Sequence, residues 1–160
     1  MEQEFSPRRC KDTRKPPADQ CPEVAFYRCP ACKALYPVTG GKDLENKQIQ
    51  CCGHMAERLI PTPAASAADI MAVSYEITGG YNDNTVRVSW KSKPYGRRPE
   101  WVYLKTFTGG YLKYVSDTKR PPLAFALADT DAFCYCDEDP CLECVFRCKR
   151  GFIVYAVSYT

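Results

Sequence analysis

The chain has 160 residues and a formal net charge of +3, a length that suits one medium domain or a small metal-stapled module beside a domain of about 100 residues. This charge is too small to indicate a nucleic-acid or lipid-surface partner, and no basic run alternates with aromatic residues as single-strand binders require. No stretch approaches the roughly 18 apolar residues of a membrane span. We therefore expect neither nucleic acid nor membrane among its partners.

Eleven cysteines beside a single histidine are the most unusual feature of the composition. In a secreted protein so many cysteines would indicate a disulfide framework. The first residues, Met1 to Phe5, are charged, however, and they lead into no apolar signal-peptide core. The odd number of cysteines also argues against a closed set of disulfides. We therefore expect a cytoplasmic, reducing environment in which thiolates bind metal.

Residues 1–23 are polar, charged and rich in proline, and we interpret them as a flexible N-terminal arm. The arm carries Cys10 and Cys21. The alternative is that one of these cysteines folds back onto a metal site, but their spacing gives that alternative little support.

Two close pairs of cysteines mark residues 24–61 as a metal-binding module. Cys29 and Cys32 are separated by Pro-Ala, and Cys51 and Cys52 are adjacent. Four thiolates form a tetrahedral cage that suits zinc or iron. The alternatives are four reduced cysteines without metal, or two disulfides. We predict a metal site, because two paired sets at this spacing on a segment with few apolar residues are typical of metal knuckles.

The two cysteine pairs require turns in the chain. Adjacent residues of a strand point to opposite faces, so Cys51 and Cys52 can face one ion only if the chain bends sharply, and Gly53 follows to permit it. Gly40-Gly41 supplies the return between the two arms. The module is thus expected to be a knuckle, a hairpin and a second knuckle.

The same module contains too few apolar residues to fold well alone, so bound metal should supply much of its folding free energy. His54 follows the second cysteine pair. With four thiols already present a fifth ligand is not needed, and we expect this side chain to be exposed and structural.

Residues 62–72 are mostly small, and we interpret them as a linker whose start is marked by Pro61 and Pro63. Residues 73–160 then read as a series of short strands separated by turn clusters such as residues 79–84. No amphipathic helix of useful length is visible. The pattern predicts an all-β fold with a β-sandwich. The expected strands are Val73–Thr78, Thr85–Trp90, Trp101–Phe107, Tyr111–Val115, Leu123–Ala128, Ala132–Cys136 and Phe152–Tyr159.

Three motifs of the first module, Tyr27-Arg-Cys-Pro-Ala-Cys32, Ile49-Gln-Cys-Cys-Gly-His-Met55 and Leu59-Ile-Pro61, resemble the desulforedoxin-like domain that opens desulfoferrodoxins. The resemblance implies that the four cysteines hold one iron in a distorted tetrahedron. Because modules of this kind often pair, it also makes a homodimer a reasonable expectation.

Residues 73–160 carry further motifs, namely Asn84-Thr-Val-Arg-Val88, Glu100-Trp-Val-Tyr-Leu104, Thr108-Gly-Gly110 and Tyr135-Cys136. They are similar to the second domain of desulfoferrodoxins and superoxide reductases, so the resemblance covers most of residues 24–159. It implies an immunoglobulin-like β-sandwich. In that family, loops of the sandwich hold a ferrous iron with four histidines and one cysteine, and superoxide is reduced at the open coordination position.

The histidine ligands of that family are missing from this sequence. Cys136 matches the cysteine ligand, but Asp139 stands where the following histidine should be, and Lys91–Arg98 and the region of Ala72 contain no histidine. Guanidinium and ammonium groups cannot replace imidazole as ligands of ferrous iron. We therefore do not expect the family's superoxide reductase activity.

A second group of cysteines, Cys136, Cys141, Cys144 and Cys148, occupies the same region, with Cys134 as an alternate. Four thiolates from this segment could hold a second iron, a zinc ion or an iron–sulfur cluster, because cluster sites use comparable spacings. The alternative is a set of reduced loop cysteines, with at most one regulatory disulfide.

Three hypotheses for the function follow. The first is a redox protein that transfers single electrons at a four-cysteine iron centre, with an electron donor or acceptor protein as its partner. The second is an enzyme of the superoxide reductase class with a rebuilt site at Cys136. The third is a zinc-stapled interaction module without redox activity. We favour the first, because it depends on the motif that is intact.

Overall fold

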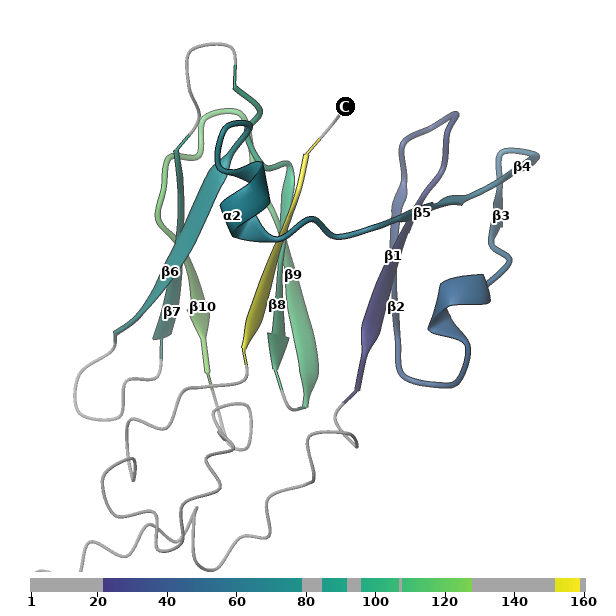
Figure 1. The fold of residues 1–160 in the computed structure, drawn as a ribbon, viewed down its shortest axis with the longest axis horizontal. Coiled ribbons are helices and arrows are strands. Elements are labelled where there is room, and N and C mark those ends of the chain that lie inside the picture. Colours follow the sequence, from purple (N-terminus) through teal and green to yellow (C-terminus); the bar gives the residue numbers. More distant parts are fainter. Residues whose placement is uncertain (1–21, 79–84, 92–95, 107, 128–151, 159–160) are drawn as a thin grey trace, which may run out of the picture. The chain divides into compact units, whose positions relative to one another are not determined.

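The computed structural model divides into two compact units, one formed by Pro22–Pro63 and one whose described part begins at Ala64. In both units nearly every regular element is an antiparallel β-strand (Figure 1). The expected all-β fold class is therefore confirmed. The structure describes residues 22–78, 85–91, 96–106, 108–127 and 152–158.

Helices are few and short in these ranges: a 3-10 turn, η2 (Leu44–Asn46), and one α-helical turn, α2 (Ala64–Ala67), inside the expected linker. No helix among the described residues has the length and apolar character needed to cross a bilayer.

The smaller unit contains two small antiparallel sheets. In the first, β1 (Val24–Arg28) is the central strand between β2 (Leu35–Thr39) and β5 (Glu57–Leu59). The second sheet is the hairpin of β3 (Gln50–Cys51) and β4 (His54–Met55). The cysteine pairs lie where these strands end or turn.

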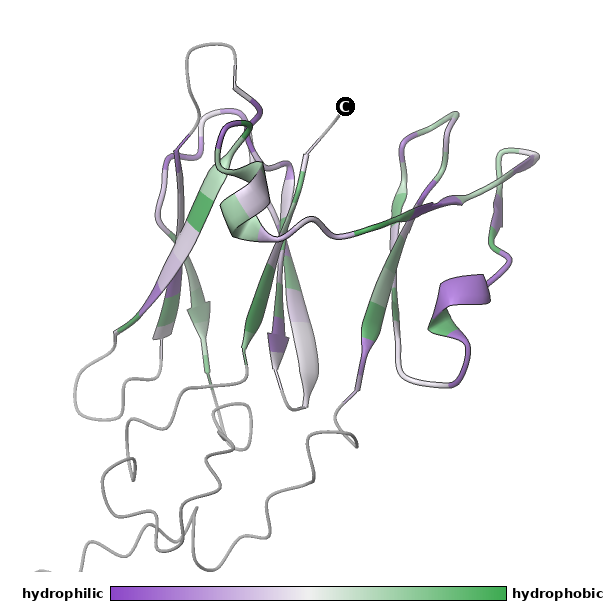
Figure 2. Ribbon diagram, viewed as in Figure 1, coloured by the Kyte–Doolittle hydropathy of each residue, from purple (hydrophilic) through white to green (hydrophobic). Residues whose placement is uncertain are grey.

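The core of the smaller unit is thin. One cluster of buried residues comprises Ala25, Tyr27 and Ala56, and the side chains of Tyr36, Val38, Leu44 and Ile49 pack against it. Figure 2 shows the contrast between the hydrophobic part of β1 and the mostly hydrophilic η2. So small an apolar cluster contributes little stability, which agrees with the expectation that bound metal stabilises this unit.

The described part of the larger unit contains two three-stranded antiparallel sheets. The first has the order β10 (Leu123–Ala126), β7 (Thr85–Lys91), β6 (Ala72–Thr78). The second has the order β11 (Ile153–Val157), β8 (Trp101–Thr106), β9 (Gly109–Tyr114).

Both sheets contribute to one hydrophobic core. Along β7 the buried residues alternate, so that Val86, Val88 and Trp90 face inward. These residues share a cluster with Phe125 of β10 and Leu104 of β8, both fully buried. Two sheets around one core are the β-sandwich that the strand pattern predicts.

The expected strands that fall in the described ranges agree with the structure to within two residues, and one of them starts two residues too late. The strands expected over Trp101–Phe107 and Tyr111–Val115 leave Gly109-Gly110 to the turn between them, whereas β9 spans Gly109–Tyr114. Both glycines pair with β8, since Gly110 lies opposite Lys105 and Gly109 opposite Thr106. The expected strand Ala132–Cys136 and the N-terminal arm lie outside the described residues.

Candidate metal centre

The first cysteine pair lies in a tight turn that follows β1. The Cys29 N–H donates to the Ala34 carbonyl oxygen and the Lys33 N–H donates to the Cys29 carbonyl oxygen, both at 3.0 Å. Lys33 adopts a positive φ of 63° to close this turn. The Cys32 N–H reaches back to Cys29 Sγ at 3.5 Å. The turn thus brings both sulfurs to one side of the backbone, as the Cys-x-x-Cys spacing predicts.

The second pair lies in the turn between β3 and β4. Cys52 and Gly53 both have positive φ values, 53° and 75°, a conformation that is unfavourable for most residues other than glycine. Cys51 pairs with His54 across this turn. The sharp turn expected from the adjacent cysteines is confirmed. His54 is exposed, as expected.

The sulfur atoms of Cys29, Cys32, Cys51 and Cys52 all lie within 4.8 Å of one another. All four are free thiols. Cys32 Sγ lies 3.5 Å from Cys51 Sγ, and Cys51 Sγ lies 3.8 Å from Cys52 Sγ. A tetrahedron with metal–sulfur bonds of about 2.3 Å has edges of about 3.8 Å. The four side chains therefore fit one tetrahedral metal ion.

The four thiols differ in exposure. Cys29 is fully buried at 0% and Cys51 is half-buried, while Cys32 and Cys52 are exposed. One side of the site is thus covered by the unit's own chain, and the other side, formed by Cys32 and Cys52, faces outward.

The thiols perturb each other's protonation. The backbone N–H of Cys32 is the largest of several influences that lower the pKa of Cys29 to about 7. Hydrogen bonds to Cys32 and then Cys51 raise the pKa of Cys52 to about 12. Four neighbouring thiols cannot all ionise without a cation between them, and a bound metal reverses this by favouring the thiolates. The arrangement therefore suits a cation.

Tyr36 on β2 is a site residue that sequence reasoning missed. The neighbouring Cys51 side chain, followed by burial, raises the pKa of Tyr36 to about 12. Tyr36 in turn lowers the pKa of Cys51, but Cys32, burial and Cys29 together outweigh it, so the pKa of Cys51 is raised overall. The sequence gives no local signal for it, because Tyr36 and Cys51 lie on strands of two different sheets.

The cysteines predicted to form a second metal site cannot be compared with the structure. Cys134, Cys136, Cys141, Cys144 and Cys148 all lie outside the described residues. The second metal site therefore stays a prediction.

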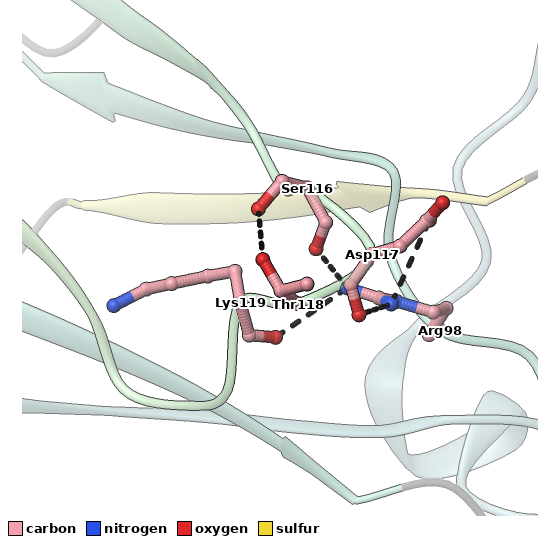
Figure 3. A network of polar contacts seen from close by, with 5 residues as sticks. All are labelled: Arg98, Ser116, Asp117, Thr118 and Lys119. Atoms are coloured by element: carbon pink, nitrogen blue, oxygen red, sulfur yellow. Dashed lines mark hydrogen bonds and ion pairs between the residues drawn. The ribbon is translucent and has the colours of Figure 1, made fainter.

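Arg98, in the segment where the family resemblance would require histidines, has a structural role. Its guanidinium donates to the carbonyl oxygens of Ser116, Asp117 and Lys119, the Asp117 contact at 2.5 Å and the Lys119 contact at 3.4 Å (Figure 3). Arg98 Nη1 also lies 3.7 Å from the carboxylate of the almost fully exposed Asp117. The side chain thereby fastens the turn that follows β9.

Comparison with known proteins supports the fold. No protein-family model matches the sequence, and no curated protein sequence matches it. Among solved structures, the crystal structure of the superoxide reductase from Treponema pallidum is similar to this chain, with a TM-score of 0.50 and 20% sequence identity. The match covers 67% of this chain and 82% of the other. At this identity the likeness shows a superoxide reductase-like fold.

Proposed function

We propose that the chain is an iron-binding redox protein that transfers single electrons at a centre held by Cys29, Cys32, Cys51 and Cys52. The observation that carries the proposal is the set of four sulfurs within 4.8 Å of one another, at separations that a tetrahedral ion requires. The desulforedoxin-like resemblance of the knuckle motifs favours iron over zinc. A bound iron ion would supply a one-electron ferric–ferrous couple.

The four cysteines would hold the ion in a closed cage. Because every ligand position of a tetrahedral ion is then taken by the chain, no position is left for a substrate. The buried Cys29 and the turns around both pairs keep the cage in one geometry, so little needs to move when its charge changes by one. These features suit electron transfer better than substrate chemistry.

The exposed sulfurs indicate where an electron would enter and leave. Cys32 and Cys52 face outward, so a partner protein docked on that side would come close to the cage. We propose a reduced carrier protein as the donor and an oxidised protein as the acceptor, in a reducing compartment. One electron moves in each step, and no covalent bond is made or broken.

A redox titration of iron-loaded protein tests this function. We expect one reversible one-electron couple in the parent chain that is lost in a Cys51→Ser variant. The matched control is Cys136→Ser, which removes a cysteine outside the cage and should keep the couple. A protein that binds iron at the cage but shows no reversible couple would rule out electron transfer.

The fold likeness to a superoxide reductase favours a second candidate function, superoxide reduction at a rebuilt site. An enzyme with a rebuilt site at Cys136 would consume superoxide in the Cys51→Ser variant but not in Cys136→Ser. We expect neither variant nor the parent chain to consume superoxide at an enzymatic rate, because the histidine ligands are absent from the sequence.

A further inference from the structure

The two cysteine pairs of the cage approach each other through Cys32 and Cys51. The Sγ atoms of these two residues lie 3.5 Å apart, although they belong to different turns of the smaller unit. A disulfide has a sulfur–sulfur bond of about 2.05 Å, so the two atoms need to approach by only about 1.5 Å to form one. The same two side chains can therefore either hold a metal ion or form a disulfide with each other.

The cage sulfurs are not equally accessible to an oxidant in solvent. Cys32 and Cys52 are exposed and Cys51 is half-buried, whereas Cys29 is 0% exposed. Cys29 Sγ is also enclosed by the backbone of both turns, since it accepts the Cys32 N–H and donates to the Cys51 carbonyl oxygen, each at 3.5 Å. An oxidant therefore reaches Cys32 and Cys52, and it does not reach Cys29.

A disulfide within the second pair is unfavourable, although the Sγ atoms of Cys51 and Cys52 lie 3.8 Å apart. Consecutive Cα atoms are about 3.8 Å apart, which is shorter than the usual Cα separation of about 4.4–6.8 Å across a disulfide. Cys52 is in addition held at a φ of 53° by the turn that continues through Gly53. Cys32 is therefore the better partner for Cys51.

A bound metal ion prepares Cys32 for oxidation. The ion keeps its ligands as thiolates, and the thiolate is the nucleophilic form of cysteine. Cysteines that respond to oxidants are typically exposed thiolates with a second cysteine close enough to complete a disulfide. Cys32 is such an exposed sulfur, and Cys51 is the second cysteine beside it.

We propose that Cys32 and Cys51 are a modification site, at which a hydroperoxide oxidises them to a disulfide and thereby releases the metal ion. The inference deepens the proposed function and rests on it in one respect, the binding of an ion by the four cysteines. It assigns to the same centre a substrate class, hydroperoxides, and a way in which electron transfer is switched off.

The reaction has two steps. The Cys32 sulfur attacks a peroxide oxygen, the O–O bond breaks, and the products are a sulfenic acid at Cys32 and one molecule of water. The Cys51 sulfur then attacks the Cys32 sulfur, the S–S bond forms, the S–O bond breaks, and a second water leaves. The two thiolates lose two electrons, which hydrogen peroxide gains, and two protons come from solvent.

The disulfide removes two of the four ligands. Cys29 and Cys52 alone do not complete a tetrahedral site, and metal affinity depends on deprotonated cysteines, so the ion leaves. The new bond joins the two turns in place of the ion and closes the segment between Cys32 and Cys51, which restricts the unfolded chain. The smaller unit thus stays folded without metal, and a thiol reductant restores the cage.

Peroxide treatment of zinc-loaded full-length protein tests the inference, because zinc has no redox chemistry of its own. Hydrogen peroxide is added without air, and released zinc is followed with a chelating dye. Thiols that remain free are blocked with a light alkylating reagent, and oxidised ones receive a heavy reagent after reduction. We expect heavy label at Cys32 and Cys51, light label at Cys29 and Cys52, and zinc release at the rate at which the heavy label appears.

The matched control is Cys136→Ser, which removes a cysteine outside the cage and should give the same labels and the same rate of zinc release. A second measurement examines the fold after oxidation. Backbone amides of β1 and β2 should exchange at least about tenfold more slowly in the oxidised, metal-free protein than in chelated, reduced protein. Equal exchange would show that the disulfide does not replace the ion.

The outcomes separate this inference from the proposed function. Heavy label at Cys29 or Cys52, or a sulfinic acid at Cys32 beside a free Cys51, overturns the assigned disulfide and leaves electron transfer standing. Iron-loaded protein without a reversible couple overturns electron transfer and leaves the disulfide standing. A chain that binds no metal overturns the metal centre, and the labels of its peroxide-treated reduced form then decide the disulfide.

Discussion

The ring of Tyr103 on β8 lies over Gly110 on β9, so closely that a Cβ atom built on the glycine would fall 2.3 Å from both Tyr103 Cζ and its hydroxyl oxygen. The two residues are diagonal neighbours, because Gly110 pairs with Lys105, two residues from Tyr103. Tyr103 is only 4% exposed and its ring lies 6.3 Å from that of Tyr155. The ring therefore has little room to move away.

We expect Gly110→Ala to destabilise the larger unit by about 1–3 kcal/mol, the usual cost of overpacking. Denaturant unfolding of Gly110→Ala, Tyr103→Leu and the double variant measures the coupling. The double variant should cost less than the sum of the single variants, because a smaller side chain at position 103 makes room for the methyl group. Strictly additive costs would show that the two residues do not interact.

The contact between Tyr103 and Gly110 also explains why the start of β9 was predicted two residues too late. A Gly-Gly pair between two apolar segments is a common turn signal, yet both glycines belong to β9. Gly110 is required by the ring that covers it, and such a contact between residues on neighbouring strands is not visible in a local pattern. By contrast, the alternation of Val86, Val88 and Trp90 is local, and the sequence predicted that strand to within one residue.

Tyr103 should make stability depend on alkaline pH. Burial and then the neighbouring Tyr155 raise the pKa of Tyr103. The folded chain thus keeps the hydroxyl proton at a pH where the unfolded chain has lost it, and the free energy of unfolding falls as the pH rises past about 10.

Denaturant unfolding between about pH 8 and pH 11 checks this, with the window set by the ordinary tyrosine pKa of about 10. A Tyr103→Phe variant should lose less stability over this range than the parent, while Tyr75→Phe, altered at an exposed tyrosine, should keep the parent slope. If Tyr103→Phe also keeps the parent slope, Tyr103 does not titrate on unfolding.

Arg98 should stabilise the turn of residues 116–119 through carbonyl oxygens more than through its ion pair. Arg98→Met removes all of its hydrogen bonds and should cost about 1–3 kcal/mol. Asp117→Asn removes only the charge of an exposed partner and should cost below about 1 kcal/mol. Thermal or denaturant unfolding compares the two variants. Equal costs would assign the effect to the ion pair instead.

Removal of the metal should destabilise the smaller unit and leave the larger unit unchanged. The smaller unit has a thin apolar cluster, so its stability depends on the ion that its cysteines hold. After chelation we expect backbone amides of β1 and β2 to exchange at least about 100-fold faster, equivalent to about 2.8 kcal/mol at 1.4 kcal/mol per tenfold change. Amides of β7 and β8 should keep their protection. Unchanged exchange in β1 and β2 would mean that the fold does not need metal.

The candidate site was only partly predictable from the sequence. The spacing of Cys29 with Cys32, and the adjacency of Cys51 with Cys52, was enough to expect both turns, because each pair constrains its own backbone. Tyr36 was missed, because its interaction with Cys51 joins strands of two different sheets. The choice between iron and zinc could not be derived from the ligands, because both metals accept four thiolates; it came from the family resemblance alone.

Elemental analysis with a visible spectrum, on protein purified without air, is the most direct test of an iron centre held by the four cysteines. We expect one iron per chain and a red colour, both lost in Cys51→Ser and kept in Cys136→Ser. A colourless protein loaded with zinc would favour a structural interaction module. Protein that holds no metal while Cys29, Cys32, Cys51 and Cys52 are reduced and the fold is intact would contradict the proposed metal centre and, with it, electron transfer.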